Sequence, residues 1–269
     1  MTKTAIAALA LRLADEGRLD LDAPEPGAPY TLRQLLRHTA GLPDYGALPA
    51  YRRAVEAGET PWSDRTVLRR TRAHRLLFAP DGGWRYSNVG YLLARRRLEE
   101  RTGHALGDAL AGLLLRPLGL RATRLAETAR DMADLLLPPP FPYHPGWVFH
   151  GTLIGPVREA ALFLHRLLEP GFLSADGLAA LLSSHRLADG EAGPPWHAPG
   201  YGLGAMTGEW RTQAGLCVGV VGHGAAGPGS RGATFRLAKG ARSVTVCAVC
   251  AEPGPDPQLG VLEAARPHL

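Results

Sequence analysis

The opening of the chain constrains its fold most, because an apolar stripe begins almost at the first residue. Its members recur at positions i, i+3, i+4 and i+7, at Ile6, Leu9, Ala10 and Leu13. This spacing is that of one face of an α-helix, and alanine and leucine favour helices. Gly17 is the residue type that commonly follows a helix end. The sequence therefore predicts a helix that ends near Gly17 and carries Lys3 in its first turn.

Composition excludes several classes of function. The chain has 269 residues, 45% of them hydrophobic, enough for a core in one large or two modest domains. The net charge of +5 comes from arginine-rich helical faces such as 95–97, without the aromatic residues that accompany nucleic-acid sites. No uncharged run is long enough to span a membrane. No H-E-x-x-H motif or carboxylate cluster predicts a metal, and no cofactor is expected.

Segment 35–45 reads Leu-Leu-Arg-His-Thr-Ala-Gly-Leu-Pro-Asp-Tyr. It follows a capping box, in which Thr31 and Gln34 satisfy the first backbone groups of a helix. We expect this helix to run through His38 and to stop at Gly41. His38 would then meet the negative end of the helix dipole, which is an architectural role.

Residues 86–88 are Tyr86-Ser87-Asn88, and a helical pattern follows to Gly103. A tyrosine can act as a general base and then protonate a leaving group if a neighbouring cation lowers its pKa from about 10. The amide of Asn88 could hold a substrate carbonyl. The motif is equally compatible with a loop tyrosine that precedes an N-capping Ser-Asn pair.

The last 70 residues carry the clearest β pattern. Runs at 216–221, 233–237 and 244–249 predict an antiparallel meander, 201–204 is expected to be a further strand, and 256–265 a short helix. The glycine-rich stretch 222–229 is expected to be a turn. It spells G-x-G-x-x-G, but a β pattern follows it where a dinucleotide site requires a helix, so we reject that reading.

Together these segments resemble the serine β-lactamase, penicillin-binding protein and carboxylesterase superfamily. Lys3 is similar to the lysine of the S-x-x-K pair, and 35–45 to the "LLsHTSGLpdy" segment. Residues 84–103 resemble the Y-S-N motif with its helix, and 222–229 the H-x-G motif. The resemblance implies an α/β (α+β), β-lactamase/transpeptidase-like fold. Residues 1–30 and 200–269 would form its α/β sheet region, and 31–199 a mainly helical region of the same unit.

The resemblance also implies roles for individual residues. The catalytic residues would be Lys3, Tyr86 and His223, and the substrate-binding residues would be Ser87, Asn88, Gly224 and Ala225. Ala225 departs from the glycine of the family pattern, and its Cβ would crowd the substrate or disfavour a positive φ. His223 could instead be an ordinary histidine of a glycine-rich turn. No metal or organic cofactor is implied.

The S-x-x-K spacing places the nucleophilic serine one residue before Met1. We therefore expect an N-terminally truncated serine hydrolase, whose 269 residues have little or no activity. The full-length protein would act on an ester, a β-lactam or a D-Ala-type amide through an acyl-enzyme. The alternative is a non-catalytic relative that binds a small acyl or peptide ligand.

Several properties stay open at the level of sequence. They are the substrate, the oligomeric state and the location. As written the chain is expected in the cytoplasm, and a periplasmic or secreted location follows if an upstream signal is missing.

Overall fold

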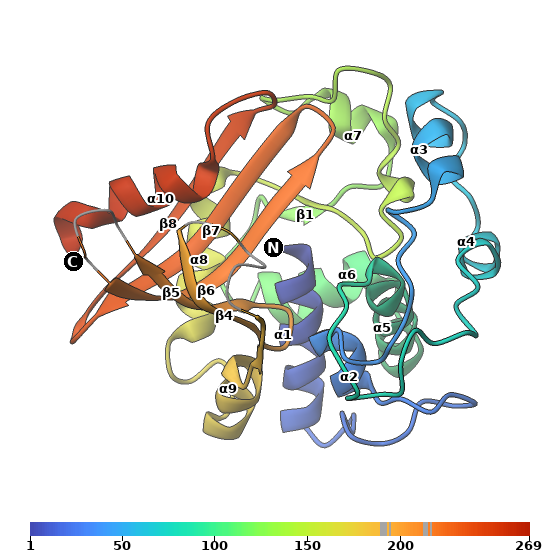
Figure 1. Ribbon diagram of the computed structural model, residues 1–269, viewed down its shortest axis with the longest axis horizontal. Helices are drawn as coiled ribbons and strands as arrows, with labels where there is room; N and C mark the ends of the chain where they lie inside the picture. Colours follow the sequence, from blue (N-terminus) through green and yellow to red (C-terminus); the bar gives the residue numbers. More distant parts are fainter. Residues whose placement is uncertain (189–192, 194, 212–214, 216) are drawn as a thin grey trace.

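The computed structural model describes residues 1–188, 193, 195–211, 215 and 217–269. An antiparallel sheet and the helices around it form the body of the molecule (Figure 1). The helices are α1 (Thr2–Asp15), α2 (Leu32–Arg37), α3 (Pro49–Glu56), α4 (Asp64–Arg70), α5 (Asn88–Thr102), α6 (Leu106–Leu110), α7 (Ala129–Ala133), α8 (Val157–Leu168), α9 (Ala175–Leu182) and α10 (Pro257–Ala265). Short π or 3-10 segments are Ala111–Leu115, Pro145–Trp147 and Arg266–His268. The strands are β1 (Arg124–Leu125), β2 (Leu153–Ile154), β3 (His185–Arg186), β4 (Trp196–Tyr201), β5 (Met206–Arg211), β6 (Cys217–Gly227), β7 (Ser230–Lys239) and β8 (Arg242–Ala251).

Helix α1 lies at the centre of the molecule. Figure 1 shows it between the sheet on one side and α2, α5 and α6 on the other. Its residues from Lys3 to Leu11 are all buried, so both faces of the helix contact other elements. Gly17 follows its end with a φ of +68°. The predicted first helix is confirmed.

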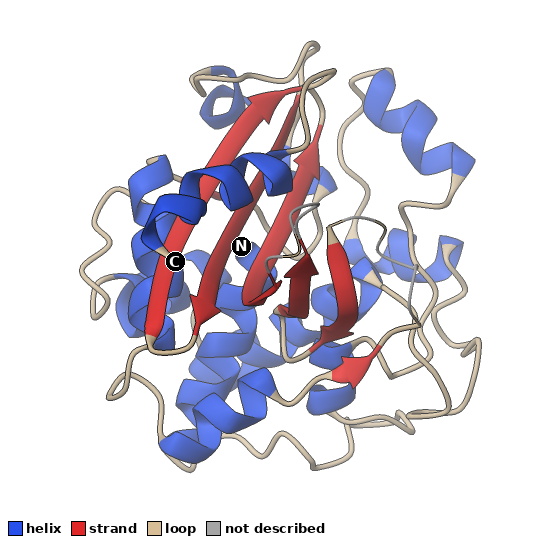
Figure 2. Ribbon diagram, turned by 60° about the vertical axis from the view of Figure 1, so that its left-hand side comes forward, coloured by secondary structure: helices blue, strands red, loops and turns tan. Residues whose placement is uncertain are grey.

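The main sheet has the order β3-β4-β5-β6-β7-β8, and each strand pairs antiparallel with the next. Because side chains alternate between the faces of a strand, Val218 and Val220 of β6 share a face with Phe235 and Leu237 of β7. This face packs on Val261 of α10, which Figure 2 shows lying across the sheet. Helix α8 contacts β7 and β8. This arrangement of an antiparallel sheet, flanking helices and a mainly helical region confirms the expected fold class.

The glycine-rich stretch is a strand, which corrects the expected turn at 222–229. Strand β6 continues to Gly227, and the turn is confined to Pro228 and Gly229. Gly222 permits this pairing, because a Cβ there would lie 2.1 Å from the carbonyl oxygen of Thr234. Leu216, expected to begin the strand, lies outside the described residues.

Two further boundaries differ from expectation. In the segment 201–204 only Tyr201 belongs to a strand, because the chain then turns to meet α1. The capping box of Thr31 and Gln34 is confirmed, but α2 ends at Arg37. His38 has a left-handed backbone with a φ of 65°, which ends the helix before Gly41 and directs the histidine ring inward.

Within the described residues, no helix combines the length and apolar character needed to cross a bilayer.

Candidate active site

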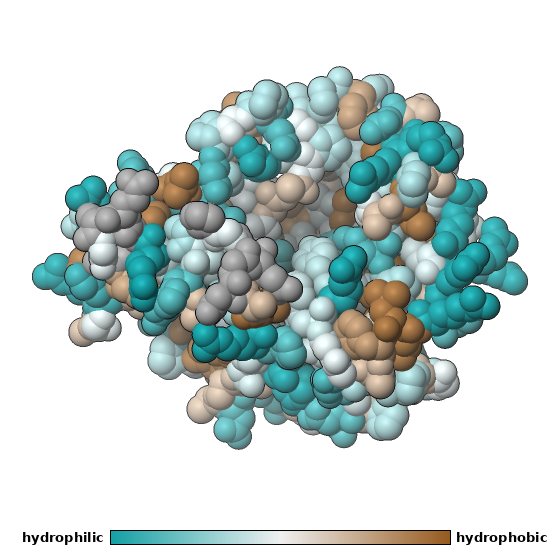
Figure 3. All heavy atoms as spheres, viewed as in Figure 1, coloured by the Kyte–Doolittle hydropathy of each residue, from teal (hydrophilic) through white to brown (hydrophobic). Residues whose placement is uncertain are grey.

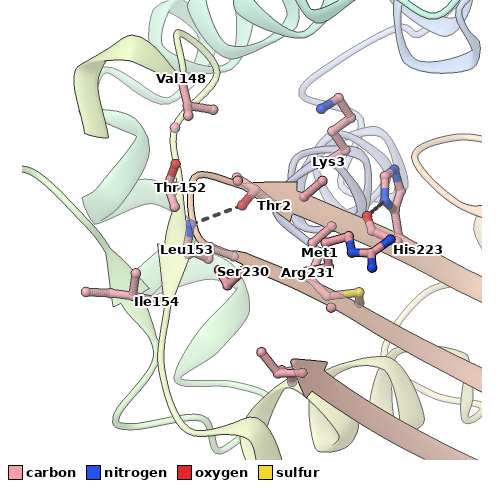
Figure 4. Close-up of a pocket in the computed structure, with 18 of the residues that line it drawn as sticks. Met1, Thr2, Lys3, Val148, Thr152, Leu153, Ile154, His223, Ser230 and Arg231 are labelled. Atoms are coloured by element: carbon pink, nitrogen blue, oxygen red, sulfur yellow. Dashed lines mark hydrogen bonds between the residues drawn. The ribbon is translucent and has the colours of Figure 1, made fainter. Parts of the chain in front are cut away.

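A pocket of about 620 Å³ opens at the N-terminal end of α1. Figure 3 shows a hollow near the middle of the face on which Figure 1 marks the N-terminus. In Figure 4, Met1, Thr2 and Lys3 lie between the segment 148–154 and the strands that carry His223, Ser230 and Arg231. The backbone N–H of Leu153 donates a hydrogen bond to the hydroxyl of Thr2 at 3.0 Å, which ties this segment to α1.

The pocket brings together six of the seven residues implied by the sequence. They are Lys3, Tyr86, Asn88, His223, Gly224 and Ala225. These residues come from α1, from the start of α5 and from β6, which are far apart in the chain. Ser87 does not line the pocket.

Lys3 is buried with 6% of its surface exposed. Its Nζ lies 3.0 Å from Nε2 of His150 and 5.0 Å from the centre of the Tyr86 ring. Burial lowers the pKa of Lys3 from 10.5 to about 7, and the Asp44 carboxylate opposes this shift only in part. A lysine in this state is partly uncharged near neutral pH, and its lone pair can then accept a proton.

Tyr86 faces the same space but is suited to a different task. Burial, assisted by the charge of Asp44, raises the pKa of Tyr86 above its usual value. The condition under which we expected a base at this position, a lowered pKa, is therefore not met. A phenol that stays protonated can donate a hydrogen bond or a proton.

Asn88 is oriented by Asp44. The backbone N–H of Asn88 donates to Asp44 Oδ1 at 2.8 Å, and its side-chain nitrogen donates to Asp44 Oδ2 at 3.4 Å. These bonds use the backbone N–H and one of the two side-chain N–H groups of Asn88. The amide oxygen of this pocket-lining residue can accept a hydrogen bond.

Ser87 has a structural position. Its hydroxyl donates to the carbonyl of Pro43 at 2.7 Å and accepts from the N–H of Gly90 at 3.1 Å, which caps α5. Its own N–H donates to Nδ1 of His38 at 3.1 Å. Both Ser87 and His38 are buried. We therefore assign Ser87 to the architecture of the loop and leave it out of the substrate-contacting set.

His223 projects from the pocket face of β6. Its Nε2 lies 3.0 Å from the hydroxyl of Tyr201, and its Nδ1 contacts the carbonyl of Gly224. Burial lowers the pKa of His223 well below its usual value. The ring is thus a neutral group held by two neighbours.

Within the part of the chain that the structure describes, the end of β6 has a free edge. Strand β5 pairs with β6 only as far as Gly222, whereas β7 pairs with β6 as far as Gly227. Residues 223–227 consequently present one side of their backbone to the pocket that they line. Ala225 is exposed on this extended strand and pairs with Gly232. Our concern that its Cβ would forbid the required backbone was wrong, because no positive φ occurs there.

Sequence reasoning missed two residues of this site. Asp44 stands inside the motif at 35–45, where we assigned no chemistry to it. His150 precedes Gly151-Thr152 in a part of the sequence that carries none of the motifs described above. Its sole sequence signal was a histidine beside a glycine, which is too common to single out.

Among the described residues, no group of three or more histidine, cysteine, aspartate or glutamate side chains is arranged to hold a metal ion.

The chain is similar to several known proteins. A profile of the family described as Beta-lactamase matches residues 1–263. Penicillin-binding protein 4* of Bacillus subtilis is 32% identical over 108 residues, which are 37% of this chain and 23% of that protein. Esterase EstB of Burkholderia gladioli is 33% identical over 166 residues, or 54% of this chain and 41% of the esterase. The matches thus span less than half the length of these relatives.

Among solved structures, a D-stereospecific amidohydrolase from Streptomyces sp. superposes with a TM-score of 0.74 at 28% sequence identity. The superposition covers 91% of this chain and 79% of the amidohydrolase.

Proposed function

Since the chain belongs to the Beta-lactamase family, a family of serine hydrolases and their relatives, we propose that its pocket serves acyl transfer from a small ester or amide to a serine and then to water. One observation carries this proposal. A buried lysine whose pKa is near 7 stands in the first turn of α1, at a pocket lined by a tyrosine, an asparagine and a strand edge.

The first step requires a hydroxyl within reach of Lys3. Positions i and i+3 of a helix lie on the same face, so a serine three positions before Lys3 would place its Oγ beside Nζ. Uncharged Lys3 would take the hydroxyl proton while Oγ bonds to the substrate carbonyl carbon and the carbonyl π electrons move to oxygen. The product of this step is a tetrahedral oxyanion.

The free edge of β6 would stabilise that oxyanion. Backbone N–H groups aimed at developing negative charge are a large source of catalysis in acyl transfer. No described strand pairs with the pocket side of residues 223–227. Asn88 would accept a hydrogen bond from the substrate or from Lys3. His223 would shape this wall and support the strand edge.

Tyr86 would then protonate the leaving group. The C–N or C–O bond breaks, the leaving nitrogen or oxygen takes the phenolic proton, and the lysine ammonium returns a proton to the phenolate. Water repeats the sequence on the acyl-serine and releases the acid. The raised pKa of Tyr86 keeps its phenol protonated before this step, so the proton to be transferred is present.

Esters and amides of D-amino acids are the substrates to test first. This choice follows the described activity of the Streptomyces amidohydrolase and the esterase relative. A β-lactam is the third class that such a site could open, since its amide undergoes the same attack.

The experiment restores the hydroxyl at the required spacing. A Met-Ser dipeptide placed before Met1 puts a serine three residues before Lys3, and a Met-Ala dipeptide is the matched control. With a p-nitrophenyl ester we expect the serine form to show a burst and a mass gain of one acyl group. The alanine form and the 269 residues alone should show neither.

Replacement of Lys3 by methionine in the serine form should reduce turnover roughly 10²–10⁴-fold, the usual contribution of a positioned base. Turnover by the 269 residues alone that Lys3→Ala abolishes would contradict the assignment of the nucleophile. If the serine form binds ester or peptide analogues, as detected by thermal stabilisation, but never becomes acylated, the binding-only alternative is the better description.

A further inference from the structure

His150 is a buried histidine that the family motifs do not account for. It lies in the segment between Pro145–Trp147 and β2, with 5% of its surface exposed. The hydrogen bond described for its side chain is the 3.0 Å contact between Nε2 and Lys3 Nζ. Within the described residues its Nδ1 is buried without a partner. The ring is therefore placed for its contact with the lysine and not for a hydrogen-bond network of its own.

The surroundings of Lys3 contain other titratable groups, but none replaces this contact. Tyr86 and Tyr91 present ring faces 5.0 and 5.4 Å from Nζ. His38, His223 and the amino group of Met1 share the same interior. Asp44 acts on Lys3 through its charge, but no ion pair of Lys3 occurs among the described residues. His150 thus supplies the close polar contact of the amine.

We propose that His150 is a positioning residue, whose neutral Nε2 accepts a hydrogen bond from the Lys3 amine and turns the amine lone pair toward the hydroxyl to be deprotonated. The role in catalysis rests on the proposed function. The physical reason is the flexibility of the lysine stem, which has many rotamers and needs an acceptor to hold one of them. In this tautomer Nδ1 carries the ring proton.

A neutral acceptor suits a lysine that must lose its proton. A carboxylate at this place would stabilise the ammonium form and hold the lysine charged at neutral pH. An apolar side chain would leave the ammonium form without a partner and make it still less favourable. A neutral imidazole stabilises the ammonium form of Lys3 less than a carboxylate would and more than an apolar side chain would. Burial and the charge of Lys3 both lower the pKa of His150, which keeps the ring neutral while Lys3 titrates.

The chain is well suited to a direct test, because it contains only two lysines, Lys3 and Lys239. With lysine labelled by ¹³C at Cε, NMR gives two signals, and Lys239→Arg assigns them. The 269 residues are titrated from pH 5 to 10, without any need for turnover. We expect the Lys3 midpoint near 7, as its surroundings indicate.

Three variants then separate the possible roles of the ring. We expect His150→Phe to lower the Lys3 midpoint by about one pH unit, since an acceptor is lost, and His150→Asp to raise it by about one unit or more. His150→Gln, which offers a neutral carbonyl acceptor, should stay within about half a unit of the wild type. Wild-type midpoints in all three variants would overturn the proposal, because a merely structural histidine would not order the variants in this way.

A second measurement does not depend on any change at His150. In the wild-type protein the ¹⁵N shift of His150 Nε2 should move at the same midpoint as Lys3. This step should vanish in Lys3→Met, while the exposed His74 serves as the reference signal. If the ¹⁵N chemical shift of His150 Nε2 does not change at the pH of the Lys3 midpoint, the proposal is also overturned.

Failure of this proposal and failure of the proposed function can be told apart. If the variants change the titration midpoint of Lys3 as expected but the serine-extended form is never acylated, the positioning role of His150 stands and the proposed hydrolase function is wrong. If the serine-extended form is acylated while His150 leaves the Lys3 midpoint unchanged, only the role of His150 is wrong.

Discussion

At the scale of single residues, burial of an amine decides what this pocket can do. Lys3 lies under Tyr86 and Tyr91, beside an imidazole, and the described residues offer it no ion pair. Taking an ammonium out of water without an opposite charge is costly, so the group releases its proton near neutral pH. The same burial that makes Lys3 a candidate base therefore makes it a source of instability when it is charged.

This cost predicts a dependence of stability on pH. The pKa of Lys3 is about 7 in the folded protein and about 10.4 when the chain is unfolded. Between these values the unfolded state binds more protons, so the free energy of unfolding must rise with pH. From pH 7.5 to 9.5 we expect the wild type to gain about 2 kcal/mol relative to Lys3→Met, measured by urea unfolding.

Lys239→Met is the control for this prediction, because Lys239 is exposed. Its free energy of unfolding should change with pH as that of the wild type does over the same range. The interval also avoids the buried histidines, whose lowered pKa values reduce stability only as the pH falls below about 6.5. If the free energies of unfolding of the wild type and Lys3→Met change with pH in parallel, the pKa of Lys3 is not lowered in the folded protein.

At the scale of elements, the turn after β4 fixes the sheet against α1. The hydroxyl of Thr4 donates to the carbonyl of Gly204 at 2.7 Å, and the N–H of Gly204 donates to the carbonyl of Leu36. Gly204 has a φ of +69°, and a Cβ there would lie 2.6 Å from the carbonyl oxygen of Lys3. This turn thus sits directly beneath the residue that carries the candidate chemistry.

We predict that Gly204→Ala destabilises the protein by more than about 2 kcal/mol, because it combines a left-handed backbone with a backbone clash. Gly227→Ala is the matched control, since no atom lies within 4 Å of the new Cβ. That control should change stability by less than about 0.5 kcal/mol. Thermal unfolding followed by circular dichroism measures both. Equal stability of the two variants would mean that the turn does not need its close approach to α1.

At the scale of the whole molecule, two clusters of buried side chains share one chain. The larger cluster surrounds α1 and includes Leu9. The smaller cluster lies between the sheet and α10 and includes Leu237. The division into a sheet region of 1–30 and 200–269 and a helical region of 31–199 stays a proposal. We propose that the two regions unfold together, because α1 contributes to the helical core and supports the pocket edge of the sheet.

Cavities in either cluster should therefore affect the same transition. We predict that Leu9→Ala and Leu237→Ala each cost about 2–5 kcal/mol, and that each variant unfolds in one step. Leu136→Ala is the control, because 93% of Leu136 is exposed, and it should be nearly neutral. Two separate calorimetric transitions in either core variant would instead show that the regions are independent.

Local patterns in the sequence determined most of the elements. The stripe of α1, the capping box of Thr31 and Gln34, and the strands around 233–237 and 244–249 all occur where their periodicity predicted them. Such patterns succeed because hydrogen-bonding periods and caps depend on near neighbours in the chain. The family resemblance added Lys3, Tyr86 and Asn88, which the pocket does bring together.

Only the tertiary structure decided which groups contact those residues and how deeply they are buried. The glycine-rich stretch became a strand because β7 supplies its hydrogen bonds. Ser87 became a cap because its hydroxyl donates to the carbonyl of Pro43 and accepts from the N–H of Gly90. His150 meets Lys3 across 147 positions of sequence. The lowered pKa of Lys3 follows from burial by elements that are remote in the chain. Burial and distant contact belong to the packed molecule, so no local pattern encodes them.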